Sequence, residues 1–361
     1  MNRIIRIRLH LLLLAPLAPP ALLSAQTVQG RVTEAGSERA VPGAIVLLVD
    51  SAGGRAGATL SDPEGEYRLT ARTGGTYRLR VERVGYAASA FAPVQLRAGE
   101  TVDLPLRVES TRIVLEPVVV TGNARSCAGD LNDGAQAATL WDEARKALLS
   151  TTLAAEAGRY RFVTETRELE TSADGRIVRR DEVEYDTLDA PFEARSAESL
   201  VSRGYVELTR REVVVYGVDA AAILSDEFLQ HHCFGLRDGG EERLGLVGLE
   251  FVPLRSRRYP DVSGVLWIDR ASAELRFVEY GYTGLEFRGP VERLTGRLHF
   301  RQLPEGTWIT EQWTLVVPVL RRVGSSPYHT MRSYQIRGLM ERTGRVLAVQ
   351  RVSPADREND E

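Results

Sequence analysis

Apolar and polar residues alternate over short runs between residues 27 and 108. Clear examples are Gly65-Glu66-Tyr67-Arg68-Leu69 and Thr76-Tyr77-Arg78-Leu79-Arg80-Val81. Turn-forming residues, such as Asp62-Pro63-Glu64-Gly65, separate these runs. Alternation with a period of two is typical of strands that bury one face, so this segment predicts a small β-sandwich.

The apolar period becomes helical after residue 135. Apolar residues recur at steps of three and four at Leu140, Trp141, Ala144, Leu148 and Leu149. This spacing predicts a helix over residues 136–158, with Gly158 as its stop. A second, short helix is expected over residues 219–231, where Asp219 can cap the first turn.

Paired strand signals follow the first helix as far as residue 350. Turn residues at 173–175, 270–273, 304–306 and 342–344 each separate two β-rich runs and predict a hairpin. A helix followed by consecutive hairpins predicts a curved, half-barrel-like antiparallel sheet wrapped around that helix. We therefore predict a mainly β chain with a sandwich at 27–108, a linker at 109–135, a second domain at 136–350 and a polar tail at 351–361.

The N-terminus has the residue order of a secretory signal peptide. Arg3, Arg6 and Arg8 precede an apolar, proline-containing run over residues 9–23, and Ser24-Ala25 offers small residues for cleavage. The run is too short to span a bilayer as a stable helix. Removal of residues 1–25 leaves 361 − 25 = 336 residues and a formal charge of −3 − 3 = −6. That charge gives no reason to expect a nucleic acid partner.

The chain contains two cysteines, Cys127 and Cys233. In an exported protein they are candidates for a disulfide, which would close a loop of 233 − 127 = 106 residues. In the chain-entropy model such a cross-link contributes up to about 4.7 kcal/mol. Two buried thiols are the alternative. A zinc site is not favoured, because no second pair of ligands has zinc-like spacing.

Three motifs in a fixed order carry a family resemblance. GRVTEAGSERAVPGAIVLL is followed by LSDPEGEYRLT and by GGTYRLRVERVGYAA. This order resembles the carboxypeptidase regulatory-like domain, a transthyretin-like β-sandwich, through Gly30, Val32, Pro42, Gly43, Ala44, Val46, Asp62, Gly65, Tyr67, Leu69, Tyr77, Leu79, Gly85 and Tyr86. The resemblance covers 108 − 26 = 82 of 361 residues and implies the fold of that part.

The patterns of a hydrolase are missing from the sequence. A zinc carboxypeptidase needs His-x-x-Glu, but no histidine after the signal peptide has a glutamate three residues on; these are His231, His232, His299 and His329. The sequence has no Gly-x-Ser-x-Gly elbow and no Gly-rich phosphate loop before a helix. We therefore predict no catalytic residue, no metal site and no cofactor.

The stretch LEPVVVTG, residues 115–122, is a candidate for partner binding. It resembles the TonB box that follows a regulatory-like sandwich in outer-membrane receptors and adds as a strand to an energy-transducing partner, through Val118, Val119, Val120, Thr121 and Gly122. A receptor also needs a plug and a large barrel, for which the remaining chain is too short. The resemblance therefore implies at most an accessory protein that binds TonB.

The hairpin GVLWIDRASAELRFVEY, residues 264–280, resembles the repeated hairpin of periplasmic lipoprotein-carrier proteins. In those proteins a half-barrel cradles apolar groups. The resemblance implies a ligand cavity on the concave face of the second domain. Its candidate lining residues are Trp267, Phe277, Phe300, Trp308 and Trp313.

These patterns favour an exported, non-enzymatic cell-envelope protein. The sandwich would act as an adaptor, and the second domain would bind an apolar ligand, a glycan or a protein partner. Two alternatives stay open: a TonB-interacting accessory protein, and an enzyme with an unrecognised site in the second domain. The expected location is the periplasm or the outer-membrane periphery of a Gram-negative-type bacterium, without a transmembrane span.

Overall fold

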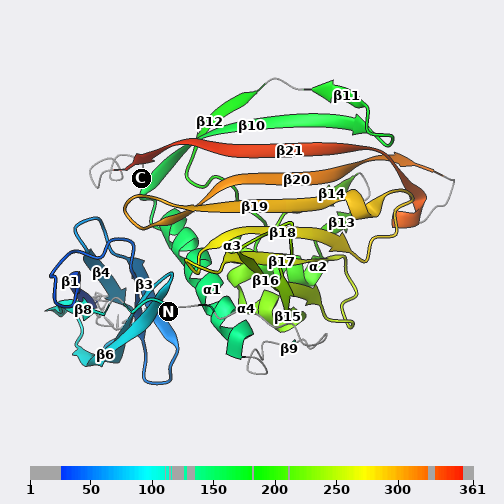
Figure 1. Cartoon of the computed structure of the whole chain (residues 1–361). Coiled ribbons are helices and arrows are strands. Elements are labelled where there is room, and N and C mark those ends of the chain that lie inside the picture. The colour runs from blue at the N-terminus through cyan, green and yellow to red at the C-terminus, as the bar shows by residue number, and fades with distance from the viewer. Residues whose placement is uncertain are drawn as a thin grey trace, which may run out of the picture.

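The computed structural model describes residues 26–109, 111–113, 115, 126–127, 135–180, 183–209, 212–323 and 330–352. Three predicted features lie outside these ranges: the signal peptide, the TonB-box-like residues 118–122 and most of the polar tail. Within the described ranges the chain is mainly β, as predicted, with a small sandwich followed by a large antiparallel sheet (Figure 1). None of the described helices is both long and apolar enough to cross a membrane.

The sandwich consists of two four-stranded sheets. The first contains β4 (Glu66–Ala71), β1 (Gln26–Glu34), β7 (Thr101–Asp103) and β8 (Leu106–Val108), with β7 and β8 both parallel to β1. The second has the order β3 (Arg55–Leu60), β2 (Ile45–Val49), β5 (Gly75–Arg83) and β6 (Tyr86–Leu96). The alternation seen in the sequence is confirmed, since Tyr67, Leu69, Tyr77 and Leu79 all lie in the core between the sheets.

In the described part of the chain, the second domain is built on one sheet of eleven strands. Its order is β11 (Ile177–Arg180), β10 (Tyr160–Ser172), β21 (Tyr334–Arg351), β20 (Trp308–Arg322), β19 (Thr295–Gln302), β18 (Leu275–Thr283), β17 (Asp261–Asp269), β16 (Leu246–Pro253), β15 (His232–Asp238) and β9 (Ser126–Cys127), and β12 (Glu184–Leu188) also pairs with β10. All these pairs are antiparallel. The sheet curves around α1 (Ala135–Glu156), the helix predicted from the apolar period (Figure 1).

Three shorter helices complete the layer on the α1 side of the sheet. They are α2 (Ala197–Arg203), α3 (Ala220–Leu224) and α4 (Asp226–His231), and a small hairpin of β13 (Val206–Leu208) and β14 (Val213–Val215) lies beside them, with short 3-10 turns at Val291–Arg293 and Met331–Ser333. Asp219 caps α3 as predicted, because its Oδ1 accepts the Ala222 N–H at 2.7 Å. The single helix predicted over 219–231 is wrong, since Ser225 ends α3 and caps α4.

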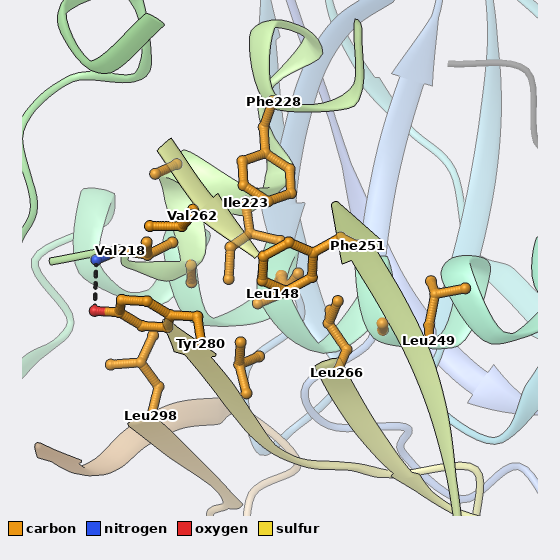
Figure 2. Close-up of a cluster of buried hydrophobic side chains, with 14 of the residues drawn as sticks. Leu148, Val218, Ile223, Phe228, Leu249, Phe251, Val262, Leu266, Tyr280 and Leu298 are labelled. Atoms are coloured by element: carbon orange, nitrogen blue, oxygen red, sulfur yellow. Dashed lines mark hydrogen bonds between the residues drawn. The ribbon is translucent and has the colours of Figure 1, made fainter. Parts of the chain in front are cut away.

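The space between the helices and the sheet is filled by one large apolar core (Figure 2). Leu148 of α1 meets Ile223 of α3 there, and Phe251 and Leu266 contribute from the sheet. Tyr280 lies in the same core, where its hydroxyl oxygen accepts a hydrogen bond from the Val218 N–H at 3.0 Å. The burial of so many large side chains fixes the helices on the concave face and leaves little open space beneath them.

One predicted hairpin is wrong. Residues 342–344 do not form a turn but lie inside β21, which continues for 18 residues from Tyr334 to Arg351. Gly344 instead lies opposite Trp313 of β20, and a Cβ on Gly344 would come within 2.3 Å of the Trp313 ring. The glycine therefore makes room for an aromatic ring, a role that a sequence pattern does not distinguish from a turn.

The two domains share a third apolar cluster. Ile45 and Leu47 point out of the sandwich from β2 and pack with Leu149 and Leu153 of α1 and with Ile309 of β20. Figure 1 shows α1 between the sandwich and the sheet. Leu115, the one described residue of the LEPVVVTG stretch, packs against the core of the second domain. These contacts hold the sandwich against α1 as a packed neighbour.

Candidate functional site

The five aromatic residues predicted to line a cavity do not surround one space. Phe300, Trp308 and Trp313 belong to the filled core beneath the helices and are at most 9% exposed. Trp267 and Phe277 stand on the other face of the sheet. There the Trp267 Nε1–H donates to Glu279 Oε1 at 2.9 Å.

A cleft of about 630 Å³ nevertheless opens at one end of the concave face. It lies between the C-terminal half of α1, β10, β20, the loop 189–197 and α3. Its lining is mainly apolar and includes Ala155, Phe162, Pro191, Phe192, Ala221 and Ile309. Ligand-binding pockets commonly measure about 300–1,000 Å³ and have this mixture of an apolar floor and a few polar groups.

The loop 189–197, which forms one wall of the cleft, is anchored at three points. The Trp313 Nε1–H donates to the carbonyl oxygen of Pro191 at 3.0 Å, and the Phe192 and Trp313 ring centroids are 5.0 Å apart. The Ala194 N–H donates to Asp219 Oδ2 at 2.9 Å. The sequence predicts that Trp313 contacts a ligand; in the structure it anchors the loop that forms one wall of the cleft.

Several polar side chains around the cleft have partners within the protein. The Thr151 and Thr152 hydroxyls each donate to a backbone carbonyl of α1 at 3.0 Å. Arg195 forms an ion pair with Glu207 at 2.9 Å and lies over the Tyr216 ring at 4.6 Å. The exposed carboxylates of Glu156 and Glu193 also line the cleft, so its mainly apolar floor has a partly charged rim.

A second cleft, of about 720 Å³, lies between the sandwich and the second domain. Charged side chains of both signs line it, among them Arg31, Glu64, Arg68, Arg159, Glu305 and Arg351. Tyr160 and Thr307 also line it; the Tyr160 hydroxyl lies 3.2 Å from Thr307 Oγ1, and burial raises the pKa of Tyr160. The lining of this cleft is therefore more strongly charged than that of the first.

The two cysteines occupy facing positions on neighbouring strands. β9 runs antiparallel to β15, with Cys127 opposite Cys233. Opposed residues of an antiparallel pair have Cα atoms about 4.5–5.5 Å apart, which lies within the range that a disulfide spans. The backbone register therefore permits the disulfide expected from the sequence, which stays a prediction.

The adjacent histidines do not converge on one point. His231 Nδ1 lies 2.7 Å from the carbonyl oxygen of Glu227, whereas His232 Nε2 lies 3.3 Å from Asp261 Oδ1. Burial raises the pKa of Asp261, but its hydrogen bond and attraction to His232, together with the Arg257 guanidinium, hold that pKa below its ordinary value. Among the described residues, no group of three or more His, Cys, Asp or Glu is placed to hold a metal ion.

Charged residues of α1 form an inter-domain contact that the sequence interpretation missed. The Gly85 N–H donates to Glu143 Oε2 at 2.6 Å, and Lys146 Nζ donates to the carbonyl oxygen of Tyr86 at 3.0 Å. Lys146 Nζ and Glu143 Oε1 are 2.5 Å apart, and both side chains are 0% exposed. Nearby, Arg145 pairs with the buried Glu82 of the sandwich at 2.6 Å.

This contact gives a structural meaning to the last family motif. Gly85 and Tyr86 form the closing Gly-Tyr of the resemblance, and their backbone is held by α1. The family model for the carboxypeptidase regulatory-like domain matches residues 27–109. Residues 27–109 are a carboxypeptidase regulatory-like domain. The match covers 109 − 26 = 83 of 361 residues, and the chain has no match among curated proteins.

Three solved structures illustrate what the chain is similar to. The 5-hydroxyisourate hydrolase of Klebsiella pneumoniae is 12% identical, covers 24% of this chain and 85% of its own, and has a TM-score of 0.20. The minor pilin GBS52 of Streptococcus agalactiae is 14% identical over 28% of this chain and 49% of its own, with a TM-score of 0.20. The major pilin BcpA of Bacillus cereus is 10% identical over 80% and 92%, with a TM-score of 0.21. Such low identities say nothing about activity.

Proposed function

We propose that the chain is an exported, non-enzymatic binding protein of the cell envelope. In this proposal the second domain holds an apolar ligand, such as an acyl chain, and the regulatory-like domain is the adaptor. The observation that carries it is the cleft of about 630 Å³ at the end of the concave face. Its mainly apolar floor favours a hydrocarbon chain over a small molecule that is charged throughout.

The fluorescence of 1-N-phenylnaphthylamine tests ligand binding directly. The mature chain is expected to bind the probe saturably and to release it when palmitate is added. The variants Ala155→Trp and Ala221→Trp place an indole in the cleft, and each is expected to weaken binding by about tenfold or more, because the bulk removes contact volume. Ala221 is exposed on α3, so the second variant fills the cleft without disturbing the packing of the core.

A matched substitution on the sandwich serves as the control. Ala88 is exposed on β6, far from the lining of the cleft, and Ala88→Trp is expected to leave binding unchanged. Absence of saturable probe binding by the native chain would refute the proposal. Equal binding by Ala221→Trp and the native chain would mean that the ligand binds outside this cleft. Binding of an oligosaccharide that these variants leave intact would favour the polar cleft between the domains.

Export is supported by the signal-like N-terminus and makes a separate prediction about the cysteines. The protein secreted through an oxidising compartment is expected to contain a Cys127–Cys233 disulfide, because the strand register sets the two residues opposite each other. Non-reducing peptide mapping is expected to find the two cysteine peptides linked. Recovery of both as alkylated free thiols from native secreted protein would contradict this.

A further inference from the structure

The outer edge of the large sheet is formed by β11 and β12. Both pair with β10, and within the described residues neither pairs with a strand on its other side (Figure 1). They lie at the end of the sheet opposite β9. The outward N–H and C=O groups of an edge strand can pair with a strand of another chain, so this edge offers a template for association.

Exposed apolar side chains concentrate on this edge. The described residues include seven large hydrophobic side chains classed as exposed, and four of them lie on β11 and β12: Ile177 at 57%, Val178 at 58%, Tyr185 at 65% and Leu188 at 37%. Single exposed apolar residues are ordinary on a protein surface. Four on two short strands with a free backbone edge indicate a protein contact.

The charges of the edge have opposite signs in its two halves. Arg176 and Arg179 accompany β11, while β12 carries Glu184 and Asp186. The Arg176 side chain is 87% exposed and pairs with Asp174 of the preceding turn at 3.2 Å, and Glu184 and Asp186 are exposed as well. Protective charges on an edge strand usually repel a second copy. On this edge the charges would attract a second copy, because the basic half is complementary to the acidic half.

An edge with opposite charges in its two halves can pair with the same edge of a second copy about a twofold axis. Antiparallel pairing of two copies about that axis sets β11 of one copy beside β12 of the other, and it makes this contact twice. Each basic half then meets an acidic half. Opposite-charge pairs and apolar pairs can both form along this contact, because each strand carries exposed apolar side chains beside its charges. Cross-strand pairs of these kinds each stabilise a sheet.

We propose that two copies of this chain associate through β11 and β12 about a twofold axis, which joins their sheets into one. This inference does not depend on the ligand proposed for the cleft. A partner strand with another sequence would lack the twofold match of charge and apolar residues. The observations therefore favour a second copy as the occupant of this edge.

Charge reversal provides a test in which two defective variants restore each other. The native mature chain is expected to have twice the monomer mass in light scattering and in sedimentation at micromolar concentrations. Arg176→Glu/Arg179→Glu makes both halves acidic, and Glu184→Arg/Asp186→Arg makes both halves basic. Each variant alone is expected to be a monomer, because both of its contacts would oppose like charges.

An equimolar mixture of the two variants is expected to form a heterodimer, since each acidic edge then meets a basic one. Native mass spectrometry identifies it by the two different masses. Arg72→Glu/Arg78→Glu changes the net charge equally on the exposed surface of the sandwich and is expected to leave the native mass unchanged. Circular dichroism confirms folding. A monomeric native chain, a dimeric single variant or a mixture that stays monomeric would each overturn the proposal.

Discussion

The variant Lys146→Met is expected to lower the free energy of unfolding by about 3–5 kcal/mol at neutral pH. Lys146 is 0% exposed, and its Nζ lies 2.5 Å from Glu143 Oε1 and 3.0 Å from Asp142 Oδ2. Methionine fits the space of the lysine stem but removes the ammonium group. The Glu143 carboxylate then stays buried at the domain contact without its cation, and an unpaired buried charge is the costly outcome.

The loss in Lys146→Met is expected to depend on pH. Burial already raises the pKa of Glu143, against the lowering effects of Lys146 and the Gly85 N–H, and removal of Lys146 raises it further. A carboxyl group whose pKa is higher in the folded state binds more protons when folded, so the stability of the protein falls as pH rises from the unfolded pKa through the folded one. Urea unfolding is therefore expected to show a smaller defect at pH 5 than at pH 7.

Two companion variants separate the charge from the packing. Glu143→Gln/Lys146→Met removes both charges and keeps an oxygen that can accept the Gly85 N–H, so it is expected to recover most of the lost stability. Asp142→Asn alters a side chain that is 37% exposed and is expected to cost less than about 1 kcal/mol. A Lys146→Met protein as stable as the native chain at both pH values would contradict the assignment.

The sandwich was predictable because its determinants are local. Alternation with a period of two tells which residues share a face, and Tyr67 and Leu69 are indeed both in the core. The turn before them also follows from its sequence. Gly65 has a φ of +81°, as the turn requires, and Asp62 Oδ1 accepts the Glu66 N–H at 2.7 Å.

The cavity residues were harder to predict, because alternation does not tell which face of a curved sheet is concave. Trp267 and Trp313 both lie within strands, but they stand on opposite faces of the sheet. Bulges add to the difficulty. The register shifts between Trp267 and Ile268 and again between His299 and Phe300, and each shift changes which side chains follow on a face.

The inter-domain contact could not be recognised from the helical period of α1. Glu143 and Lys146 fall between its apolar positions, where charged residues normally face water. Their burial arises because the sandwich covers that side of the helix, as the contact of Lys146 with Tyr86 shows. Residues 60 positions apart in the chain meet there, and no local pattern encodes that distance.

The second large effect is expected from Gly43→Ala, which should lower the free energy of unfolding by about 2–5 kcal/mol. Gly43 has a φ of +65°, where a Cβ costs about 1–2 kcal/mol. That Cβ would also lie 2.3 Å from the backbone carbonyl carbon of Gly306, in the turn between β19 and β20. Backbone cannot rotate away as a flexible side chain does, so the domains must separate locally, at a further cost of about 1–3 kcal/mol.

Gly53→Ala isolates the inter-domain part of this effect. Gly53 also lies in the sandwich, with a φ of +86°, but a Cβ there would meet no atom within 4 Å. This variant therefore carries the backbone strain alone and is expected to lose about 1–2 kcal/mol in urea unfolding. The difference between the two variants measures how tightly the 41–43 loop is packed on the second domain. Equal losses would mean that the contact between Gly43 and Gly306 yields freely.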